Sequence, residues 1–189
     1  MASEQRPLRA DAVRNRAKIV QAARAEIAER GIDVGMDEIA RAAGVAVGTL
    51  YRHFPTKAAL VAGIVSEYVE ATAIDAEESL ARVRARDTSA LDEVAGFIER
   101  VGESASAHHV VKAAARNLGV DASHDSAAEA RISAAFEEIL RLGQASGALR
   151  DGFTVSDLFL LLTTVPVDLP ADARQRWVQL VLPGVAAGT

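Results

Sequence analysis

At 189 residues the chain can form one domain of moderate size, or a small module joined to a larger one, and half of its residues are hydrophobic. The absence of cysteine excludes disulfide scaffolds, thiolate metal sites and cysteine nucleophiles. The first dozen residues are polar and charged, and the longest apolar run, Leu158 to Leu162, is far shorter than the ~20 residues needed to cross a bilayer. We therefore expect neither a signal peptide nor a membrane span, and a cytoplasmic location.

The net charge of −5 is distributed unevenly along the chain. Residues 1–57 carry ten basic and seven acidic residues, a net charge of +3, whereas the rest carry 11 basic and 19 acidic residues, a net charge of −8. A basic end on an acidic body is attracted to phosphate in one orientation. Scattered surface charge would give a similar count, so the split supports nucleic-acid binding only together with a motif.

Residues 1 to about 10 are expected to be disordered, with Arg6 and Arg9 either lying along a duplex as a flexible arm or remaining solvated. From Asp11 to Arg30 the spacing of apolar residues predicts an amphipathic first helix that ends at Gly31. Its apolar face consists of Val13, Ala17, Val20, Ala23 and Ile27. Near the start of this helix, Arg14 and Lys18 are candidates for phosphate contacts.

The segment from Met36 to Lys57 predicts two short helices joined by a tight turn. Gly44 stands where the chain leaves helical geometry, and glycine accepts a positive φ without steric cost. Pro55 ends the second helix, and Thr56 is suited to cap the next one. This is a helix-turn-helix, the second helix of which enters the major groove of DNA.

The second helix of this motif, about residues 47–53, is predicted to be the recognition helix. Between its core positions it offers hydrogen-bonding and cationic groups for phosphates and base edges. The predicted DNA-binding residues of the motif are Val47, Gly48, Thr49, Tyr51, Arg52 and His53, with Lys57 in the first turn of the next helix. An ordinary helical hairpin, in which Tyr51 packs and the others are solvated, is the alternative.

The sequence GTLYRHFPTK at residues 48–57, with Ala59 and Leu60, resembles a signature of the TetR family of bacterial transcriptional regulators. The resemblance continues upstream through residues 14–31 and covers about the first third of the chain. It implies that Tyr51, His53 and Lys57 contact backbone phosphates.

The chain departs from the family pattern at several positions. Gly35 and Ala46 replace hydroxyl residues that often cap the motif helices, so those caps must come from other groups or be absent. Asp37 stands where a basic residue is common, and Val47 where a polar one is common. Because Val47 has no hydrogen-bonding group, we expect it to pack against a thymine methyl.

The rest of the chain predicts a series of helices without strand-like alternation. A fourth helix runs from about Lys57 to about Arg86, and a fifth begins after a cap at Thr88 or Ser89. A shorter helix follows over residues 107–118, and another follows a capping-box pattern at Ser126 and Glu129, with Gly143 interrupting its last turns.

The last two helices are predicted to form a dimer surface. Leu158 to Leu162 are apolar all the way round a helix that starts at Thr154, so both of its sides must be covered, one of them by a second copy. The final helix starts near Pro170 and ends at Pro183. The predicted dimer residues are Leu158, Leu161, Leu162, Thr164, Trp177, Val178 and Val181.

The family resemblance also implies a small-molecule effector bound in the helical body. Candidate pocket residues are Phe97, Val101, His109, Phe136, Leu140 and Phe159, for each of which a role in the plain core is the simpler reading. No catalytic residue, metal site or cofactor is predicted, since adjacent His108 and His109 point about 100° apart on a helix and no nucleotide-binding or nucleophile motif is present.

We therefore expect an all-α fold of about nine helices, with a three-helix helix-turn-helix DNA-binding domain at residues 11–56 and a helical-bundle effector-binding and dimerisation domain at residues 57–189. The expected function is that of a homodimeric, non-enzymatic repressor that a small molecule releases from a near-palindromic operator of double-stranded DNA. The alternatives are a helical enzyme or carrier that uses the apolar pocket, and a DNA-binding protein without an effector. Activation instead of repression stays open, as do the effector and the operator.

Overall fold

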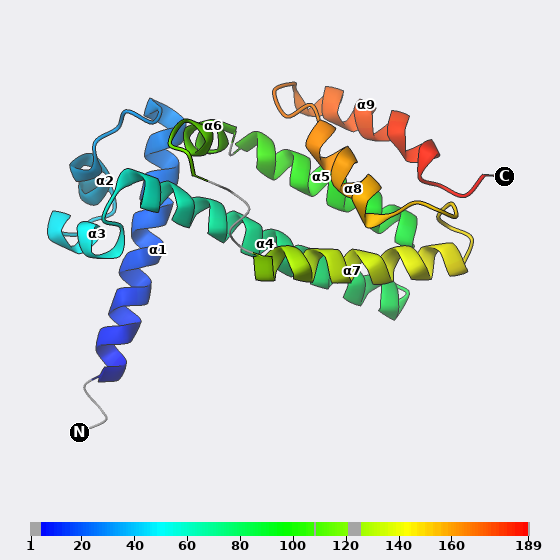
Figure 1. Cartoon of the computed structure of the whole chain (residues 1–189), viewed down its shortest axis with the longest axis horizontal. Helices are drawn as coiled ribbons and strands as arrows, with labels where there is room; N and C mark the ends of the chain where they lie inside the picture. Colours follow the sequence, from blue (N-terminus) through cyan, green and yellow to red (C-terminus); the bar gives the residue numbers. More distant parts are fainter. Residues whose placement is uncertain (1–4, 108, 121–125, 189) are drawn as a thin grey trace. The chain divides into compact units, whose positions relative to one another are not determined.

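The computed structural model describes residues 5–107, 109–120 and 126–188, and within these ranges the protein is all-helical. Nine α-helices and one 3-10 turn follow each other along this part of the chain (Figure 1), and the all-α prediction is confirmed. None of these helices has both the length and the apolar character needed to span a bilayer. The elements are α1 Gln5–Arg30, α2 Met36–Ala42, α3 Val47–His53, α4 Lys57–Ala85, α5 Ala90–Ala107, α6 His109–Asn117, α7 Ser126–Ala145, α8 Val155–Thr164, α9 Ala171–Val181 and the 3-10 turn η2 Leu182–Gly184.

The residues group into two compact units. The first consists of Met1–Glu67 and Val110–His124, and the second of Tyr68–His109 and Asp125–Thr189. The long helix α4 therefore contributes residues to both units. Most of α6 belongs to the first unit, although its residues were assigned to the effector domain from the sequence.

The core of the first unit surrounds the two short helices. Leu50 on α3 and Ile39 on α2 are completely buried against α1 and the start of α4. Two residues of α6, Val111 and Ala115, complete the same apolar cluster. Helices α2 and α3 thus share one apolar core with residues of α1, α4 and α6, which fixes the position of the exposed side of α3.

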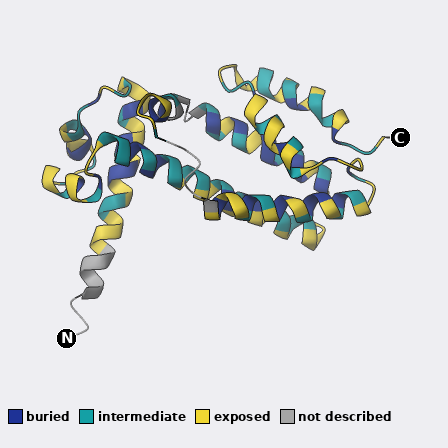
Figure 2. Ribbon diagram, viewed as in Figure 1, coloured by how far each residue is buried: buried dark blue, intermediate teal, exposed yellow. Residues whose placement is uncertain are grey.

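Helix α1 is longer than its apolar contact with the core. It begins at Gln5, so residues 5–10, which were expected to be disordered, are helical; Pro7 is compatible with this because the first turn of a helix needs no backbone donors. The predicted apolar face is wrong at Val13, which is 69% exposed, and at Ala17. Burial starts only at Ile19, and Figure 2 shows exposed residues along the preceding turns.

The core of the second unit is built on α5, which packs against α7, α8 and α9. Phe97 and Phe136 meet at its centre with ring centroids 4.3 Å apart. The prediction that Gly143 interrupts α7 is wrong, because the helix continues through it to Ala145. A Cβ at Gly143 would lie 2.4 Å from Leu149 Cδ1 and 2.7 Å from Ala90 Cβ, so glycine is required here for close packing.

A group of charged residues links α4 to α5 inside the second unit. Glu93, which is only 6% exposed, accepts hydrogen bonds from Arg82 Nε and Nη2 at 2.7 and 2.9 Å. Asp75 accepts from Arg100 Nε at 2.9 Å, and the buried Ser79 hydroxyl oxygen accepts from both arginines. Because each buried polar atom has a partner, the cluster fixes the register of the two helices without an unpaired charge.

Helix α8 starts at a capping box, as predicted from its sequence. The Thr154 hydroxyl oxygen accepts from the Asp157 N–H at 3.2 Å, and the Asp157 carboxylate accepts from the Thr154 N–H at 2.9 Å. The hydroxyl group and the N–H group of Thr154 both lower the pKa of Asp157. The helix therefore has a defined first residue, which sets the rotation of the leucines that follow.

Candidate nucleic-acid interface

The turn between α2 and α3 has the geometry that its glycine predicts. Gly44 adopts a φ of +66°, its N–H donates to the Arg41 carbonyl at 3.1 Å, and the Val45 N–H donates to the Ala40 carbonyl at 3.0 Å. These two hydrogen bonds close the end of α2 in the manner of a Schellman motif. Helix α3 then runs over Val47–His53, the range expected from the sequence.

The C-terminal end of α3 is anchored to its neighbours through Phe54, which is 4% exposed. Its ring packs so closely on α4 that a Cβ at Gly63 would lie 2.7 Å from Phe54 Cε1. The Arg16 guanidinium of α1 lies 5.4 Å from the ring centroid and also pairs with Glu67 at 2.6 Å. The next helix is capped by Thr56, which accepts from the Ala59 N–H at 3.1 Å, as predicted.

The side of α3 that faces away from the core carries most of the predicted DNA-binding residues. Val47 is 40% exposed and Tyr51 is 44% exposed, and Gly48 and Arg52 lie on the surface with them. Thr49 and His53 are half-buried at the edges of this face. We call this surface, Val47–Arg52 without the buried Leu50, the α3 face; Figure 2 shows the helix largely exposed.

Several cations of the first unit have no hydrogen bond or ion pair within the part of the chain that the structure describes. Among the predicted contacts these are Lys18 on α1 and Arg52 on α3, whereas Arg14 pairs with Asp11. Arg24 on α1 and Arg41 on α2 are also exposed and unpaired, and sequence reasoning did not single them out. Unpaired arginine and lysine side chains are the groups that neutralise phosphate.

Lys57 is held at the start of α4. Its ammonium donates to the carbonyl oxygen of Ile32 at 2.6 Å, in the loop that precedes α2. An ammonium has three donors, so this contact leaves others for a phosphate. The carbonyl restrains a long side chain that would otherwise lose conformational freedom on binding DNA.

The two motif helices lack side-chain caps, as the substitutions at Gly35 and Ala46 imply. At Gly35 the carboxylate of Glu38 supplies the other half of a capping box, because it accepts from the Gly35 N–H at 2.8 Å. Arg30 donates to the same carboxylate at 2.6 Å, and both hydrogen bonds lower the pKa of Glu38, that from Arg30 more strongly. The first turn of α2 thus carries two negative charges, those of Asp37 and Glu38.

The residues predicted to line an effector pocket are mostly packed in the second core. Phe97 and Phe136 are completely buried, Leu140 is 3% exposed and Val101 packs against the same cluster. Phe159 is 36% exposed on α8, and the side chain of His109 lies outside the described residues.

Two cavities lined by described residues of the second unit can be compared with this prediction. One, of about 640 Å³, lies beside the α4–α5 turn, and the other, of about 170 Å³, lies between α5 and α9. Neither is lined by any of the predicted pocket residues. His108 and His124 lie outside the described residues, within which no group of three potential metal ligands comes together.

The residues predicted for the dimer surface separate into buried and accessible ones. Leu158 and Val178 are 0% and 4% exposed within the single chain, so their side chains have almost no surface to offer a partner. On α8, which starts at the Thr154 capping box, Leu158 is turned towards the core, whereas Leu160 is 61% exposed. Leu180 on α9 is 63% exposed, and neither it nor Leu160 was predicted. Of the remaining predicted residues, Thr164 is exposed, and those that are half-buried are Leu161, Leu162, Trp177 and Val181.

Sequence comparison finds two families of regulatory domains in the chain. Residues 19–64 match bacterial regulatory proteins of the tetR family, and residues 92–187 match the C-terminal domain of SbtR-like transcriptional regulators. A curated relative, the HTH-type transcriptional regulator SAR0097 of Staphylococcus aureus (strain MRSA252), is 38% identical over 84 residues. That match covers 43% of this chain and 44% of the relative, so it spans less than half of either protein.

Solved structures resemble the protein over nearly its whole length. A TetR transcription regulatory protein from Mycobacterium vanbaalenii is 34% identical, with a TM-score of 0.74 and coverage of 95% of this chain and 99% of that chain. The TetR transcriptional regulator SCO0520 from Streptomyces coelicolor is 28% identical, with a TM-score of 0.70 and coverage of 92% and 99%. The similarity therefore includes both units and not only the helix-turn-helix.

Proposed function

Because the chain belongs to the TetR family of bacterial regulatory proteins, we propose that this DNA-binding transcriptional regulator is a ligand-responsive repressor that acts in the cytoplasm. The observation that carries the DNA-binding part is the α3 face. Leu50 and Phe54 fix one side of a seven-residue helix in the core, and the other side presents Val47, Tyr51 and Arg52 to solvent. A short, rigidly held helix with an exposed polar side is the element that enters a major groove.

In this proposal, Tyr51, Arg52 and Lys57 position the helix on phosphates, and Val47 contributes to reading of the sequence. The methyl groups of Val47 are exposed at the first turn of α3, where they can pack against a thymine methyl. Genome-wide mapping of bound sites would supply the operator, and fluorescence anisotropy with that duplex would measure the affinity.

Replacing each thymine of the mapped operator by uracil removes one methyl group at a time and tests the role of Val47. At the position that Val47 contacts, we expect several-fold weaker binding by the native protein and an unchanged affinity of Val47→Ala. Equal affinity at every uracil position would refute this role and leave DNA binding itself unaffected.

We further propose that the protein binds its operator as a homodimer through α8 and α9. Leu160 and Leu180 are large apolar side chains that are more than half exposed on these helices, and Phe159 and Leu169 add to the exposed apolar area. An apolar surface of this kind is favourable only when it is covered. A symmetric dimer presents two recognition helices about 34 Å apart, one turn of DNA, and reads a near-palindrome.

Release by a small molecule requires that the effector bind one arrangement of the dimer more tightly than the other. Because Phe97, Phe136 and Leu140 are packed together, a cavity at that place requires these side chains to move apart. The same packing favours the second candidate, a DNA-binding regulator without an effector. Fluorescence anisotropy of the bound operator, measured with metabolites from the pathways of neighbouring genes, distinguishes a ligand-responsive repressor from a regulator without an effector. A compound that releases the DNA would establish the ligand-responsive repressor.

A further inference from the structure

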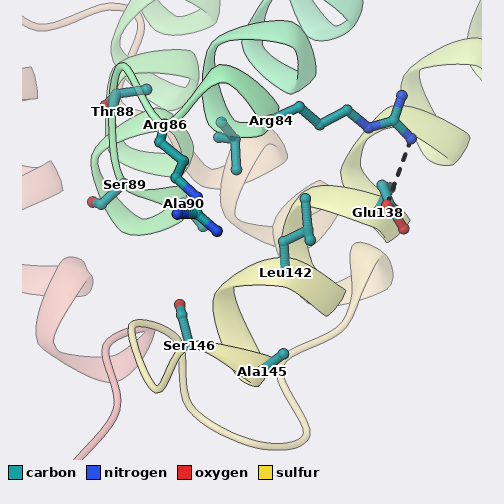
Figure 3. Close-up of a pocket in the computed structure, with 10 residues that line it drawn as sticks. Arg84, Arg86, Thr88, Ser89, Ala90, Glu138, Leu142, Ala145 and Ser146 are labelled. Carbon is teal, nitrogen blue, oxygen red and sulfur yellow. Dashed lines mark ion pairs between the residues drawn. The ribbon is translucent and has the colours of Figure 1, made fainter.

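The larger of the two cavities lies at the end of α4, away from the packed centre of the second unit. The turn that joins α4 to α5 forms one wall, and the C-terminal part of α7 forms the other (Figure 3). Its volume of about 640 Å³ falls in the range of small-molecule sites, roughly 300–1,000 Å³. Val83, Ala90, Leu142 and Ala145 give it an apolar lining, and the charged groups lie around this lining.

The charges in the cavity do not cancel each other. Glu138 is already occupied, since it accepts from Arg141 Nε and Nη2 at 2.7 and 2.9 Å and pairs with Arg84 at 3.5 Å (dashed in Figure 3). Arg86, in contrast, has no hydrogen bond or ion pair within the described ranges of the chain. One guanidinium group therefore faces the cavity with its donors unused.

The backbone of Arg86 is held in an unusual conformation. Its φ is +62°, in the left-handed region that glycine normally occupies at the end of a helix. Two hydrogen bonds of 3.1 Å close α4 at this point: the Arg86 N–H donates to the Val83 carbonyl, and the Asp87 N–H donates to the Arg82 carbonyl. No other described non-glycine residue has a positive φ. A glycine would close the helix with less strain, so the fold alone does not explain an arginine at this position.

From these observations we infer that the cavity binds a small amphipathic carboxylate. The planar guanidinium of Arg86 holds the carboxylate through two parallel hydrogen bonds, and the apolar part of the ligand rests on Val83, Leu142 and Ala145. A phosphate dianion fits less well, because Arg86 is the one lining cation without a carboxylate partner among the described residues and the carboxylate of Glu138 lies in the same cavity. This site is separate from DNA binding and from the predicted pocket around Phe97.

The test uses the full-length protein and three probes: hexanoate, its uncharged analogue hexanamide, and inorganic phosphate. In a ¹H–¹⁵N chemical-shift titration, hexanoate should cause saturable shifts of amides in residues 83–90 and 138–146 at millimolar concentration. Hexanamide and phosphate should bind at least about tenfold more weakly, the loss expected for one charge-assisted hydrogen-bonded pair. Equal binding of hexanoate and hexanamide, or shifts that do not saturate, would overturn the inference.

Two substitutions distinguish the contribution of the Arg86 guanidinium to ligand binding from its effect on the stability of the fold. Arg86→Gly removes the cation and suits the left-handed backbone, so the melting temperature should rise while hexanoate affinity falls at least about tenfold. Arg86→Lys keeps the charge without the planar pair of donors and should lose less affinity than Arg86→Gly. Arg150→Gln, a change at an exposed arginine outside the cavity, is the control and should bind hexanoate as the native protein does. A folded Arg86→Gly protein with native affinity would refute the site.

Discussion

At the scale of single residues, the glycines of this protein have three different physical roles. Gly44 is needed for its positive φ, and Gly143 is needed because Leu149 and Ala90 leave no room for a Cβ. Gly48 has neither requirement: its φ is not positive, and a Cβ built there would meet nothing within 4 Å. Since glycine inside a helix is less stable than alanine by about 1 kcal/mol, its place on the α3 face points to a partner that approaches closely.

Gly48→Ala is therefore expected to change stability and DNA binding in opposite directions. The free energy of unfolding should rise by up to about 1 kcal/mol, because alanine is the better helix former and has open space. Operator affinity should fall, because the added methyl group holds α3 away from the groove. Urea denaturation and fluorescence anisotropy measure the two effects, and a more stable protein with unchanged affinity would show that Gly48 does not lie against DNA.

Lys57 gives the second prediction at this scale. Lys57→Ala should weaken binding to all DNA sequences by a similar factor, because an ammonium that contacts phosphate carries no sequence information. The slope of log affinity against log salt concentration should become shallower by about one unit. Arg150→Ala, which removes an exposed cation of the second unit, should leave the slope unchanged. A loss confined to one operator sequence would contradict the phosphate role.

At the scale of helices, local sequence signals predicted where the elements begin and end. They did not predict which residues neighbouring helices would bury. The Thr154–Asp157 box, the turn at Gly44 and the stop at Pro55 each depend on residues a few positions apart, so they could be recognised in the sequence. Periodicity gives only the apolar side of a helix and not how far a neighbour extends along it. For this reason the burial of Val13 was predicted wrongly.

At the candidate site, too, the sequence predicted the exposed face of a helix but not the contacts between residues distant in the chain. The identity of the α3 face followed from helical spacing, since Leu50 and Phe54 could be separated from the residues between them. The contact of Lys57 with the Ile32 carbonyl depends on residues that are brought together only by folding. The same is true of the lack of a hydrogen bond or ion pair for Arg41 among the described residues. The exposure of Leu160 could not be read from an uninterrupted run of apolar residues, because periodicity gives no rotation for such a helix.

Gly143→Ala should destabilise the protein although alanine favours helices. The Cβ would lie 2.4 Å from Leu149 Cδ1 and 2.7 Å from the Cβ of buried Ala90, so a packed region must move, at a typical cost of about 1–3 kcal/mol. This exceeds the gain in helix propensity of about 1 kcal/mol. A lower midpoint of urea denaturation is expected, and a higher one would mean that Leu149 repacks freely.

The pairing of Glu138 with arginines of α4 and α7 predicts a dependence of stability on pH. Arg141 and, less strongly, Arg84 lower the pKa of Glu138 from 4.5 to about 2. Because the folded state favours the ionised form, this stabilisation is complete above pH 4.5 and is lost as pH falls towards 2. Glu138→Gln should thus be less stable than the native protein at pH 7, with the difference shrinking over that range. If the difference in urea midpoint between the native protein and Glu138→Gln did not change with pH, the ionised pairing of Glu138 with the arginines would be ruled out.

At the scale of the whole molecule, assembly can be tested without disturbing the fold. Leu160 is already exposed in the single chain, so Leu160→Asp removes no core contact and should leave the melting temperature of the monomer nearly unchanged. If α8 contributes to a dimer, a buried carboxylate there should shift the protein to monomers and weaken binding to a palindromic operator far more than binding to a half-site. Analytical ultracentrifugation gives the mass, and a native protein that is monomeric at micromolar concentration would refute the proposed assembly.

The packing of α6 into the first core bears on how such a regulator can be divided and reused. Val111 and Ala115 lie in the same apolar cluster as Leu50 and Ile39, although residues 51–110 separate them from Leu50 in the chain. A fusion protein that takes only the first 56 or 67 residues to transplant operator recognition would leave that cluster open to water. A functional graft must also include His109–Asn117, so the exchangeable part is discontinuous in the gene.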